Sequence, residues 1–189
     1  MASTRPRRER PPLDRIKLDE LALAYVGRFA TTRARLGDYL RRKLRERGWA
    51  GEEDAPVAAL VERLAGAGYV DDAAFALSKA RALTNRGYGG GRVRQSLHAA
   101  GVGEADAAPA TRLAQAGAVD AAVRFARRRR LGPFAAAAPD RRERERAIAA
   151  LLRAGHGFVI SRAIVDLAPG AEADLAALAD ASGVDAITD

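Results

Sequence analysis

The sequence lacks most of the groups on which enzymes and metalloproteins depend. Its 189 residues include no cysteine, which excludes disulfides, thiolate catalysis and cysteine-ligated metal centres. The two histidines, His98 and His156, lie far apart in the chain with no acidic cluster beside either. Paired carboxylates, a nucleophile beside a base and a phosphate loop with Lys-Ser/Thr after its glycines are also missing. We therefore expect no enzymatic activity, no catalytic residue, no metal and no cofactor.

Aromatic residues and long apolar runs are scarce as well. Aromatic residues make up 5% of the chain and alanine about a quarter, so the core is expected to consist of thin helix–helix layers. No stretch approaches the roughly 18 apolar residues that a membrane span needs, and the first fifteen residues lack the apolar run of a secretion signal. These observations predict a cytoplasmic protein without membrane contact.

Positive charge is the strongest compositional feature. Lysine and arginine total 32 against 24 acidic residues, a net charge of +8, and 29 of the 32 are arginines. The charge alternates along the chain: residues 1–50 and 109–153 carry net +8 and +7, whereas residues 51–108 and 154–189 carry −2 and −5. This pattern indicates binding of a polyanion or of an acidic protein groove, without choosing between them.

A repeat of about fifty-three residues organises the sequence. Three segments share two small or apolar residues four apart, followed four residues later by glycine: Leu40-x-x-x-Leu44-x-x-x-Gly48, Val93-x-x-x-Leu97-x-x-x-Gly101 and Ala147-x-x-x-Leu151-x-x-x-Gly155. This spacing places the apolar residues on one stripe of a helix, and the glycine supplies a left-handed residue that ends it.

Each repeat is interpreted as three helices. They are expected at 18–29, 34–47 and 56–66, then at 72–84, 91–100 and 109–115, and finally at 118–130, 141–154 and 158–167. Pro109 is expected to open its helix at the first position. No window alternates with a period of two, so no sheet is expected.

The predicted fold class is all-α, an elongated array of three tandem three-helix repeats that resemble helix-turn-helix units. The repeats are placed at 16–70, 71–117 and 118–167. A basic segment, 1–15, precedes them and is expected to be disordered. An acidic, alanine-rich tail, 168–189, follows them. It is interpreted either as mobile or as a short helix that docks on a basic face.

The segment Gly68-Tyr69-Val70-Asp71-Asp72-Ala73-Ala74-Phe75-Ala76 resembles the signature of the RecX family. Residues 86–89, 97–102, 128–134 and 152–158 resemble later parts of the same family, so the likeness runs from about Leu18 to Asp166. The chain departs from the family pattern in a longer alanine-rich loop at 131–140 and in the acidic tail.

The resemblance implies a bacterial regulator that binds the RecA recombinase filament on single-stranded DNA and inhibits or destabilises it. Such a protein would modulate recombinational DNA repair and the SOS response, and we expect it to be a monomer. Asp71 or Asp72 is expected to cap the helix that carries Phe75, a core residue. The motif residues are interpreted as mainly structural: Gly68, Tyr69, Asp71, Asp72, Phe75, Gly101 and Gly155.

Partner-binding residues are expected among the clustered arginines. Residues 41, 42 and 45 lie opposite the apolar stripe of their helix and are therefore exposed. The run 127–130 forms either a solvated cationic helix end, which the helix dipole favours, or a contact for a polyanion or acidic groove. We expect the partner at these two basic segments rather than between them. The predicted contact residues are Arg41, Arg42, Arg45, Arg127, Arg128, Arg129, Arg130, Arg141, Arg142 and Arg144.

A direct DNA-binding regulator of helix-turn-helix type is the alternative hypothesis. It is disfavoured because asparagine and glutamine are few and the repeats are in tandem rather than two-fold related. Tyr88 is the one aromatic residue expected to be exposed, which favours contacts with the backbone of single- or double-stranded DNA, or with protein, over base stacking. The glycine-rich loop 87–91 is interpreted as a linker, with phosphate contact as the alternative. The aromatic residues expected on core faces are Tyr39, Trp49, Tyr69, Phe75 and Phe125.

Overall fold

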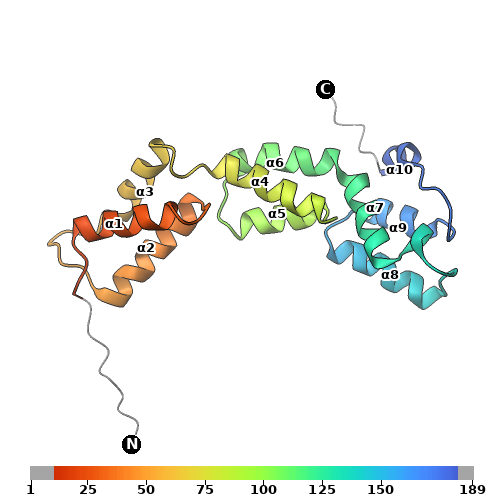
Figure 1. Cartoon of the computed structure of the whole chain (residues 1–189), viewed down its shortest axis with the longest axis horizontal. Helices are drawn as coiled ribbons and strands as arrows, with labels where there is room; N and C mark the ends of the chain where they lie inside the picture. The colour runs from red at the N-terminus through yellow and green to blue at the C-terminus, as the bar shows by residue number, and fades with distance from the viewer. Residues whose placement is uncertain (1–10, 183–189) are drawn as a thin grey trace, which may run out of the picture. The chain divides into compact units, whose positions relative to one another are not determined.

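The structure, a computed structural model, describes residues 11–182 and divides the chain into two compact units, one up to Asp71 and one from Asp72. Within the described residues it contains ten α-helices, a short 3₁₀ helix and no β-strand (Figure 1). The prediction of an all-α fold without a sheet is therefore confirmed. None of the helices in this part of the chain is long and apolar enough to cross a bilayer.

The N-terminal unit is a single three-helix repeat. It comprises α1 (Arg15–Val26), α2 (Arg33–Arg47) and α3 (Val57–Gly66). The side chains of Asp14 and Thr32 accept hydrogen bonds from backbone N–H groups in the first turns of α1 and α2, which fixes where these helices begin. One apolar core joins the three helices, and its fully buried side chains include Leu13, Leu18, Leu36 and Leu40.

Part of the segment that was expected to be disordered is ordered. Residues 1–10 of the expected disordered segment lie outside the described residues, but Leu13 is completely buried. The backbone of Leu13 donates to Gly48 at 3.0 Å and accepts from Ala50 at 2.9 Å, and Arg47 donates to the Pro11 carbonyl. The expectation of disorder up to residue 15 is therefore wrong, because one leucine inserts between the helices and its backbone pairs with the segment that follows α2.

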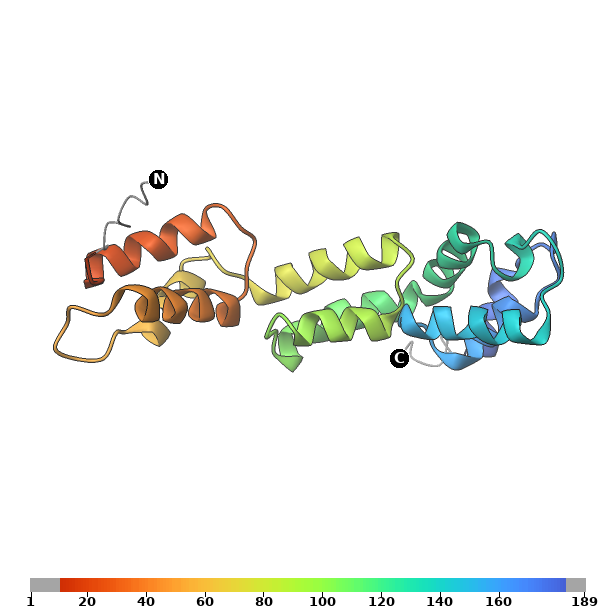
Figure 2. The same ribbon diagram turned by 90° about the horizontal axis from the view of Figure 1, so that it is seen from below.

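The second repeat opens the C-terminal unit with α4 (Asp72–Asn85), α5 (Gly90–His98) and α6 (Glu104–Ala116). α4 runs alongside α6 (Figures 1 and 2), and alanines such as Ala76, Ala80 and Ala110 fill the thin layer between the helices. Pro109 does not open α6, which begins at Glu104 after the N-cap residue Gly103. Two acidic residues in the first turn favour this earlier start, because they interact favourably with the helix dipole. This gain exceeds the cost of placing Pro109, which has no backbone N–H to donate, inside the helix.

The third repeat contains α7 (Ala118–Arg129), the 3₁₀ helix η1 (Gly132–Phe134), α8 (Arg141–Arg153) and α9 (Phe158–Asp166). A further helix, α10 (Leu175–Ser182), occupies part of the expected acidic tail and packs on α7 and α9. Its contact is apolar rather than basic, since Leu178 is buried with Val119, Ala122 and Ile160. The tail was expected either to be mobile or to form a short helix docked on a basic face. The structure has the helix, but burial of its apolar side chains, rather than charge, positions it.

Close backbone packing joins the second and third repeats within the C-terminal unit. The Gly89 N–H donates to the Ala154 carbonyl and the Gly91 N–H to the Gly155 carbonyl, both at 2.9 Å. A Cβ at Gly89 would overlap the Gly155 carbonyl, so only glycine permits this approach. The glycine-rich loop is therefore a structural joint, as its linker interpretation anticipated.

Two of the aromatic expectations are wrong. Tyr69, expected in the core, is 59% exposed, whereas Tyr88, expected at the surface, is half-buried against Phe125 and Leu151. Phe75 is only partly buried, so its predicted core role is weaker than the sequence suggested. Phe125 is buried as predicted, and Tyr39 and Trp49 pack on the edge of the N-terminal core.

Candidate functional site

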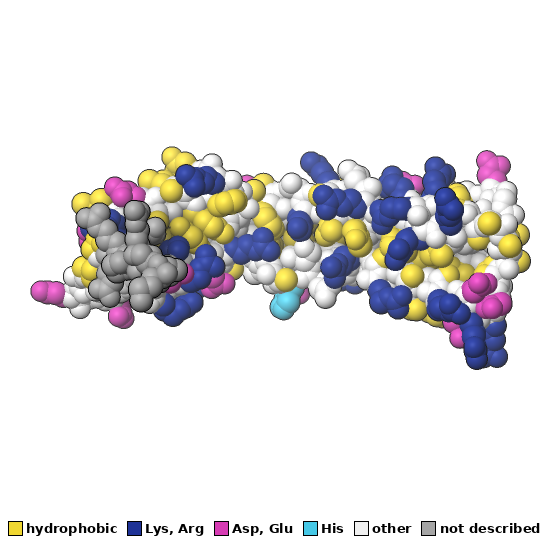
Figure 3. Space-filling view, turned by 60° about the horizontal axis from the view of Figure 1, so that its bottom comes forward, with side chains coloured by type: hydrophobic (Ala, Val, Ile, Leu, Met, Phe, Trp, Pro, Cys, Tyr) yellow, Lys and Arg dark blue, Asp and Glu magenta, His cyan; other side chains and the backbone are white. Residues whose placement is uncertain are grey.

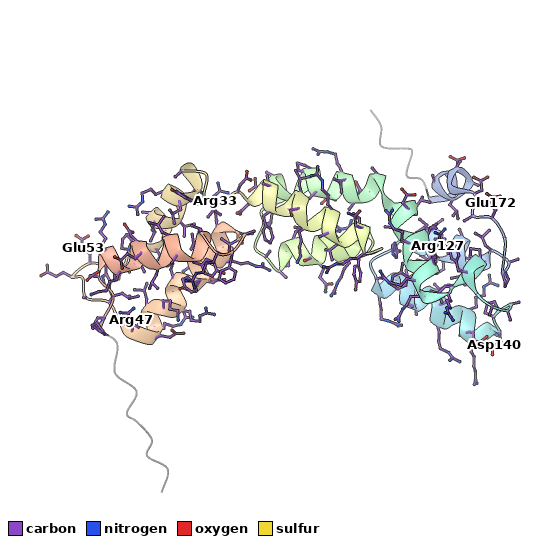
Figure 4. All side chains as sticks on the ribbon, in the orientation of Figure 1. Arg33, Arg47, Glu53, Arg127, Asp140 and Glu172 are labelled. Carbon is purple, nitrogen blue, oxygen red and sulfur yellow. The ribbon has the colours of Figure 1, made fainter. Side chains whose placement is uncertain are left out.

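Four consecutive arginines, 127–130, form what we call the α7 arginine cluster. They occupy the last turn of α7 and the residue after it, and all four side chains are exposed, as predicted (Figure 4 labels Arg127). Cations at this position interact favourably with the partial negative charge of a helix C-terminus. Figure 3 shows further Lys and Arg side chains over the same unit, with fewer acidic ones on that face.

Aromatic rings hold most of this cluster in place. The Arg127 guanidinium lies 5.1 Å from the centre of the Phe134 ring, and that of Arg128 lies 5.5 Å from Phe125 and 6.0 Å from Tyr88. Arg128 also donates a hydrogen bond to the Arg86 carbonyl. Guanidinium groups over aromatic faces remain charged and accessible while they lose less freedom on binding than unsupported side chains. The cluster is thus partly preorganised.

Arg130 has an unusual backbone conformation. Its φ of 54° and ψ of 52° are left-handed, and it is the one non-glycine residue with positive φ among residues 11–182. Helices α3, α4, α5 and α8 end in the same pair of hydrogen bonds, with a glycine of positive φ in the equivalent place: Gly68, Gly87, Gly101 and Gly155. A side chain at this position costs about 1 kcal/mol, so glycine would be more stable there than arginine.

A hollow of about 510 Å³ lies beside the cluster, between the end of α7, the loop after η1 and α8. Arg129, Arg130 and Arg146 contribute positive charge to its lining, with one carboxylate, Glu143. Its remaining walls are apolar and are formed by Leu131, Ala135, Ala137, Ala138, Pro139, Ala147, Ala150 and Val165. A second hollow, of about 450 Å³, is lined by Arg86, Tyr88, Phe125, Arg128 and Arg129. Basic rims over apolar walls suit a protein segment that carries both acidic and apolar side chains.

The arginines of α8 have different surroundings. Arg141 pairs with Glu145 along the helix at 3.1 Å. Arg144 pairs with Asp166 of α9, and the same Asp166 carboxylate lies 3.5 Å from Arg162. Asp140 and Glu143 close a capping box at the start of this helix (Figure 4 labels Asp140). Arg142 has no carboxylate within ion-pair distance among the described residues. Of the three predicted α8 contacts, Arg142 is therefore the most available and Arg144 the least.

Arg41, Arg42 and Arg45, which we call the α2 arginine row, lie exposed on the N-terminal unit as predicted. Arg41 pairs with Asp38 at 2.9 Å, and Arg42 lies 3.8 Å from Glu46 and 5.6 Å from the centre of the Tyr39 ring. Exposed pairs of this kind contribute little to stability, so both guanidinium groups can exchange these carboxylates for a partner's.

Five of the seven motif residues lie at the ends of helices. Gly68, Gly101 and Gly155 supply the left-handed residues after α3, α5 and α8. Asp71 directly precedes α4, and Asp72 is its first residue and is buried. Nothing in their placement brings a third acidic group to the pair within the described residues.

Comparison with known proteins places the chain. Residues 71–110 match the family model described as "RecX, second three-helix domain". The chain is 35% identical over 173 residues to the "Regulatory protein RecX" of Myxococcus xanthus, and the alignment covers 87% of this chain and 90% of that protein. The chain belongs to the RecX family. The likeness proposed from the signature at residues 68–76 is thereby confirmed.

Solved RecX structures share the fold of this RecX-family chain. A crystal structure of regulatory protein RecX matches with a TM-score of 0.59 and 23% identity over 79% of this chain and 70% of that one. RecX from Lactobacillus salivarius matches with a TM-score of 0.58 and 20% identity over 79% of this chain and 93% of that one.

Several residues around the arginines escaped sequence reasoning. Phe134 and Arg86 support the α7 arginine cluster although they lie in different segments of the chain. Tyr25 and Phe29 form an aromatic group with Tyr39 on the N-terminal unit. The spacing of four between Tyr25 and Phe29 was the available signal for that group, since the helix expected at 18–29 would place both on one face. That expectation is wrong by three residues at each end, because α1 ends at Val26 and Phe29 follows the turn after it.

Proposed function

We propose that this RecX-family protein binds the filament that RecA forms on single-stranded DNA and restrains its activity. Family membership supports a regulatory role, and the observation that carries the proposal is the α7 arginine cluster: four exposed arginines beside a hollow with basic and apolar walls. The protein acts by binding, as a monomer without a cofactor, and the filament supplies the catalytic activity that is regulated.

The physical basis is the sum of several weak contacts. A nucleoprotein filament repeats the same acidic protein surfaces and phosphates along its length, and arginine can engage either of them through two parallel hydrogen bonds. The α7 arginine cluster and the α2 arginine row lie on different compact units of one chain. Once one unit binds, the other encounters its site at high effective concentration, so the filament is favoured over free subunits. A bound chain would exclude a second DNA strand and hinder subunit exchange.

Reversal of charge in the cluster tests this proposal. The double variant Arg128→Glu/Arg129→Glu should raise the concentration needed to inhibit DNA-dependent ATP hydrolysis by RecA while circular dichroism shows an unchanged helical content. The matched control is Arg81→Glu/Arg112→Glu, which makes the same charge change at exposed arginines of α4 and α6. Equal inhibition by all three proteins would refute a role for the cluster.

The α2 arginine row is tested by combination. Adding Arg41→Glu to the double variant should weaken inhibition more than the product of the separate effects, because bivalent binding is then lost. Full inhibition by the combined variant would contradict the two-site proposal.

The salt dependence of inhibition distinguishes binding to the RecA filament from regulation through direct binding to DNA. Binding to naked DNA through phosphates weakens steeply as salt rises. Inhibition of a preformed filament at substoichiometric protein should persist at near-physiological salt. If inhibition instead disappears in parallel with binding to naked DNA, the protein is a DNA-binding regulator.

A further inference from the structure

Three aromatic rings gather on the N-terminal unit at the end of α1. Tyr25 and Tyr39 are stacked, with ring centres 4.2 Å apart and planes 18° from parallel. The Phe29 ring centre lies 5.4 Å from that of Tyr25, with the ring planes 50° apart, and Phe29 is 57% exposed. The Phe29 N–H donates to the Tyr25 carbonyl at 3.1 Å, which fixes the backbone that carries the exposed ring.

A hollow of about 490 Å³ opens beside these rings, and we call it the aromatic hollow. Its lining consists of the three rings, Leu21, Ala24, Arg28 and Arg42. Among the described residues that line it there is no carboxylate. Arg28 is exposed and has no ion-pair partner in the described part of the chain, and the carboxylate of Glu46 lies closer to Lys43, at 2.6 Å, than to Arg42, at 3.8 Å.

This combination of flat rings and exposed guanidinium groups, in a hollow without a carboxylate in its lining, is what unpaired nucleotides require. Proteins that bind single strands combine aromatic side chains on which bases stack with cations that follow the phosphates. The aromatic hollow differs from the 450 Å³ hollow beside the α7 arginine cluster in the exposure of its rings. Phe125 and Tyr88 are buried or half-buried there, whereas Phe29 is 57% exposed and offers a ring face on which a base can stack.

We propose that the aromatic hollow binds an unpaired base of single-stranded DNA. The base stacks on Phe29, which packs against Tyr25 of the stacked pair, and Arg28 and Arg42 contact the flanking phosphates. The hollow lies wholly within the N-terminal unit, so it operates separately from the α7 arginine cluster. This inference goes beyond filament binding, because it assigns a direct contact with the nucleotide bases.

The test measures binding of the full chain to a short fluorescein-labelled oligodeoxythymidylate by anisotropy, without any recombinase. Phe29→Ala should weaken binding about 5- to 150-fold, the range that loss of one base–aromatic stack produces. Phe29→Trp should retain or improve it. The matched control is Ile16→Ala, which removes another exposed apolar side chain, 72% exposed, from the first turn of α1, at the opposite end of that helix from Phe29.

A second oligonucleotide isolates stacking from charge. On a strand of the same length whose sugars carry no bases, wild type and Phe29→Ala should bind equally, whereas Arg28→Glu/Arg42→Glu should weaken binding to both strands. When a strand that contains 5-iododeoxyuridine is photocrosslinked to the protein, the modified base should become attached to Tyr25 or Phe29.

Three results would overturn the proposal. If Phe29→Ala and Ile16→Ala bind the base-containing strand alike, the rings do not stack a base. If Phe29→Ala weakens binding to the abasic strand as strongly as binding to the base-containing strand, the loss of affinity comes from a change in protein structure and not from a lost base stack. If Phe29→Ala leaves DNA binding unchanged and abolishes only inhibition of RecA, the hollow is a protein contact. Because no recombinase is present in the binding assay, failure here leaves the filament proposal untouched.

Discussion

Gly89→Ala should disrupt the joint between the second and third repeats, and Gly90→Ala should not. The backbone of Gly89, with φ −81° and ψ 171°, is a conformation that alanine readily adopts, so no dihedral strain is involved. The added methyl group would instead overlap the Gly155 carbonyl and lie 2.6 Å from the His156 nitrogen. At Gly90 the same methyl group meets only the flexible Arg94 side chain, at 3.7 Å.

The expected magnitudes follow from the hydrogen bonds at the joint. To relieve the overlap, the Gly155 turn must move away, which breaks the bonds that Gly89 and Gly91 donate to it. With about 1 kcal/mol for each bond and a further contribution from imperfect repacking, Gly89→Ala should destabilise the C-terminal unit by about 2–3 kcal/mol. Gly90→Ala should stabilise it by about 0.4–1 kcal/mol, because alanine restricts the unfolded chain.

Thermal unfolding followed by circular dichroism measures both effects. At about 4 °C per kcal/mol for a domain of this size, Gly89→Ala should lower the Tm by about 8–12 °C, whereas Gly90→Ala should leave it unchanged or raise it. Hydrogen exchange should accelerate in the peptides around residues 89 and 155 in the first variant alone. Equal melting temperatures for the two variants would refute the argument that close backbone approach demands glycine at position 89.

Two further predictions concern single residues of the C-terminal unit. Arg130→Gly should raise stability by about 1 kcal/mol because it removes a side chain from a left-handed conformation. The same variant should weaken inhibition of RecA, whereas a gain in stability with unchanged inhibition would show that the guanidinium makes no contact. Burial lowers the pKa of His156, whose Nε2–H donates to the Gly87 carbonyl at 3.0 Å, while that hydrogen bond opposes the shift. Because the folded pKa lies below the unfolded value of about 6.5, the unfolded state binds more protons at acidic pH, and stability should fall as the pH drops through about 6.5. His156→Gln, which can still donate but does not titrate, should lose this part of the pH dependence in melting experiments between pH 7.5 and 5, and identical slopes would contradict it.

The helices could be predicted from the sequence because their signals are local. Apolar residues at a spacing of four and glycines at the helix ends determine α2, α5 and α8, and the structure has these helices within one or two residues of their expected bounds. Pro109 misled the prediction because the start of α6 depends on Gly103 and two acidic residues nearby, a balance of small free energies. Leu13 was missed because its burial depends on a contact with residues 48–50, which no local pattern reports.

Tyr69 and Tyr88 show why the exposure of aromatic residues could not be predicted. Each follows the left-handed glycine at the end of a helix, Gly68 after α3 and Gly87 after α4, and each donates its N–H to the carbonyl five residues earlier. Their local structures are therefore alike. Tyr88 is covered because α7 and α8 bring Phe125 and Leu151 against it, whereas Tyr69 remains exposed. Burial in a thin helical layer depends on the neighbouring repeat, which the local sequence does not encode.

Arg130 is the place where the repeat pattern itself could have pointed to function. Five helices end in the same arrangement of hydrogen bonds, and four of them have glycine at the left-handed position. The fifth has arginine, which is less stable there by about 1 kcal/mol. Strain of this kind persists where something other than stability favours the residue. Arg130 lines the 510 Å³ hollow, so the binding role that we propose for the cluster would explain why arginine stands at this position.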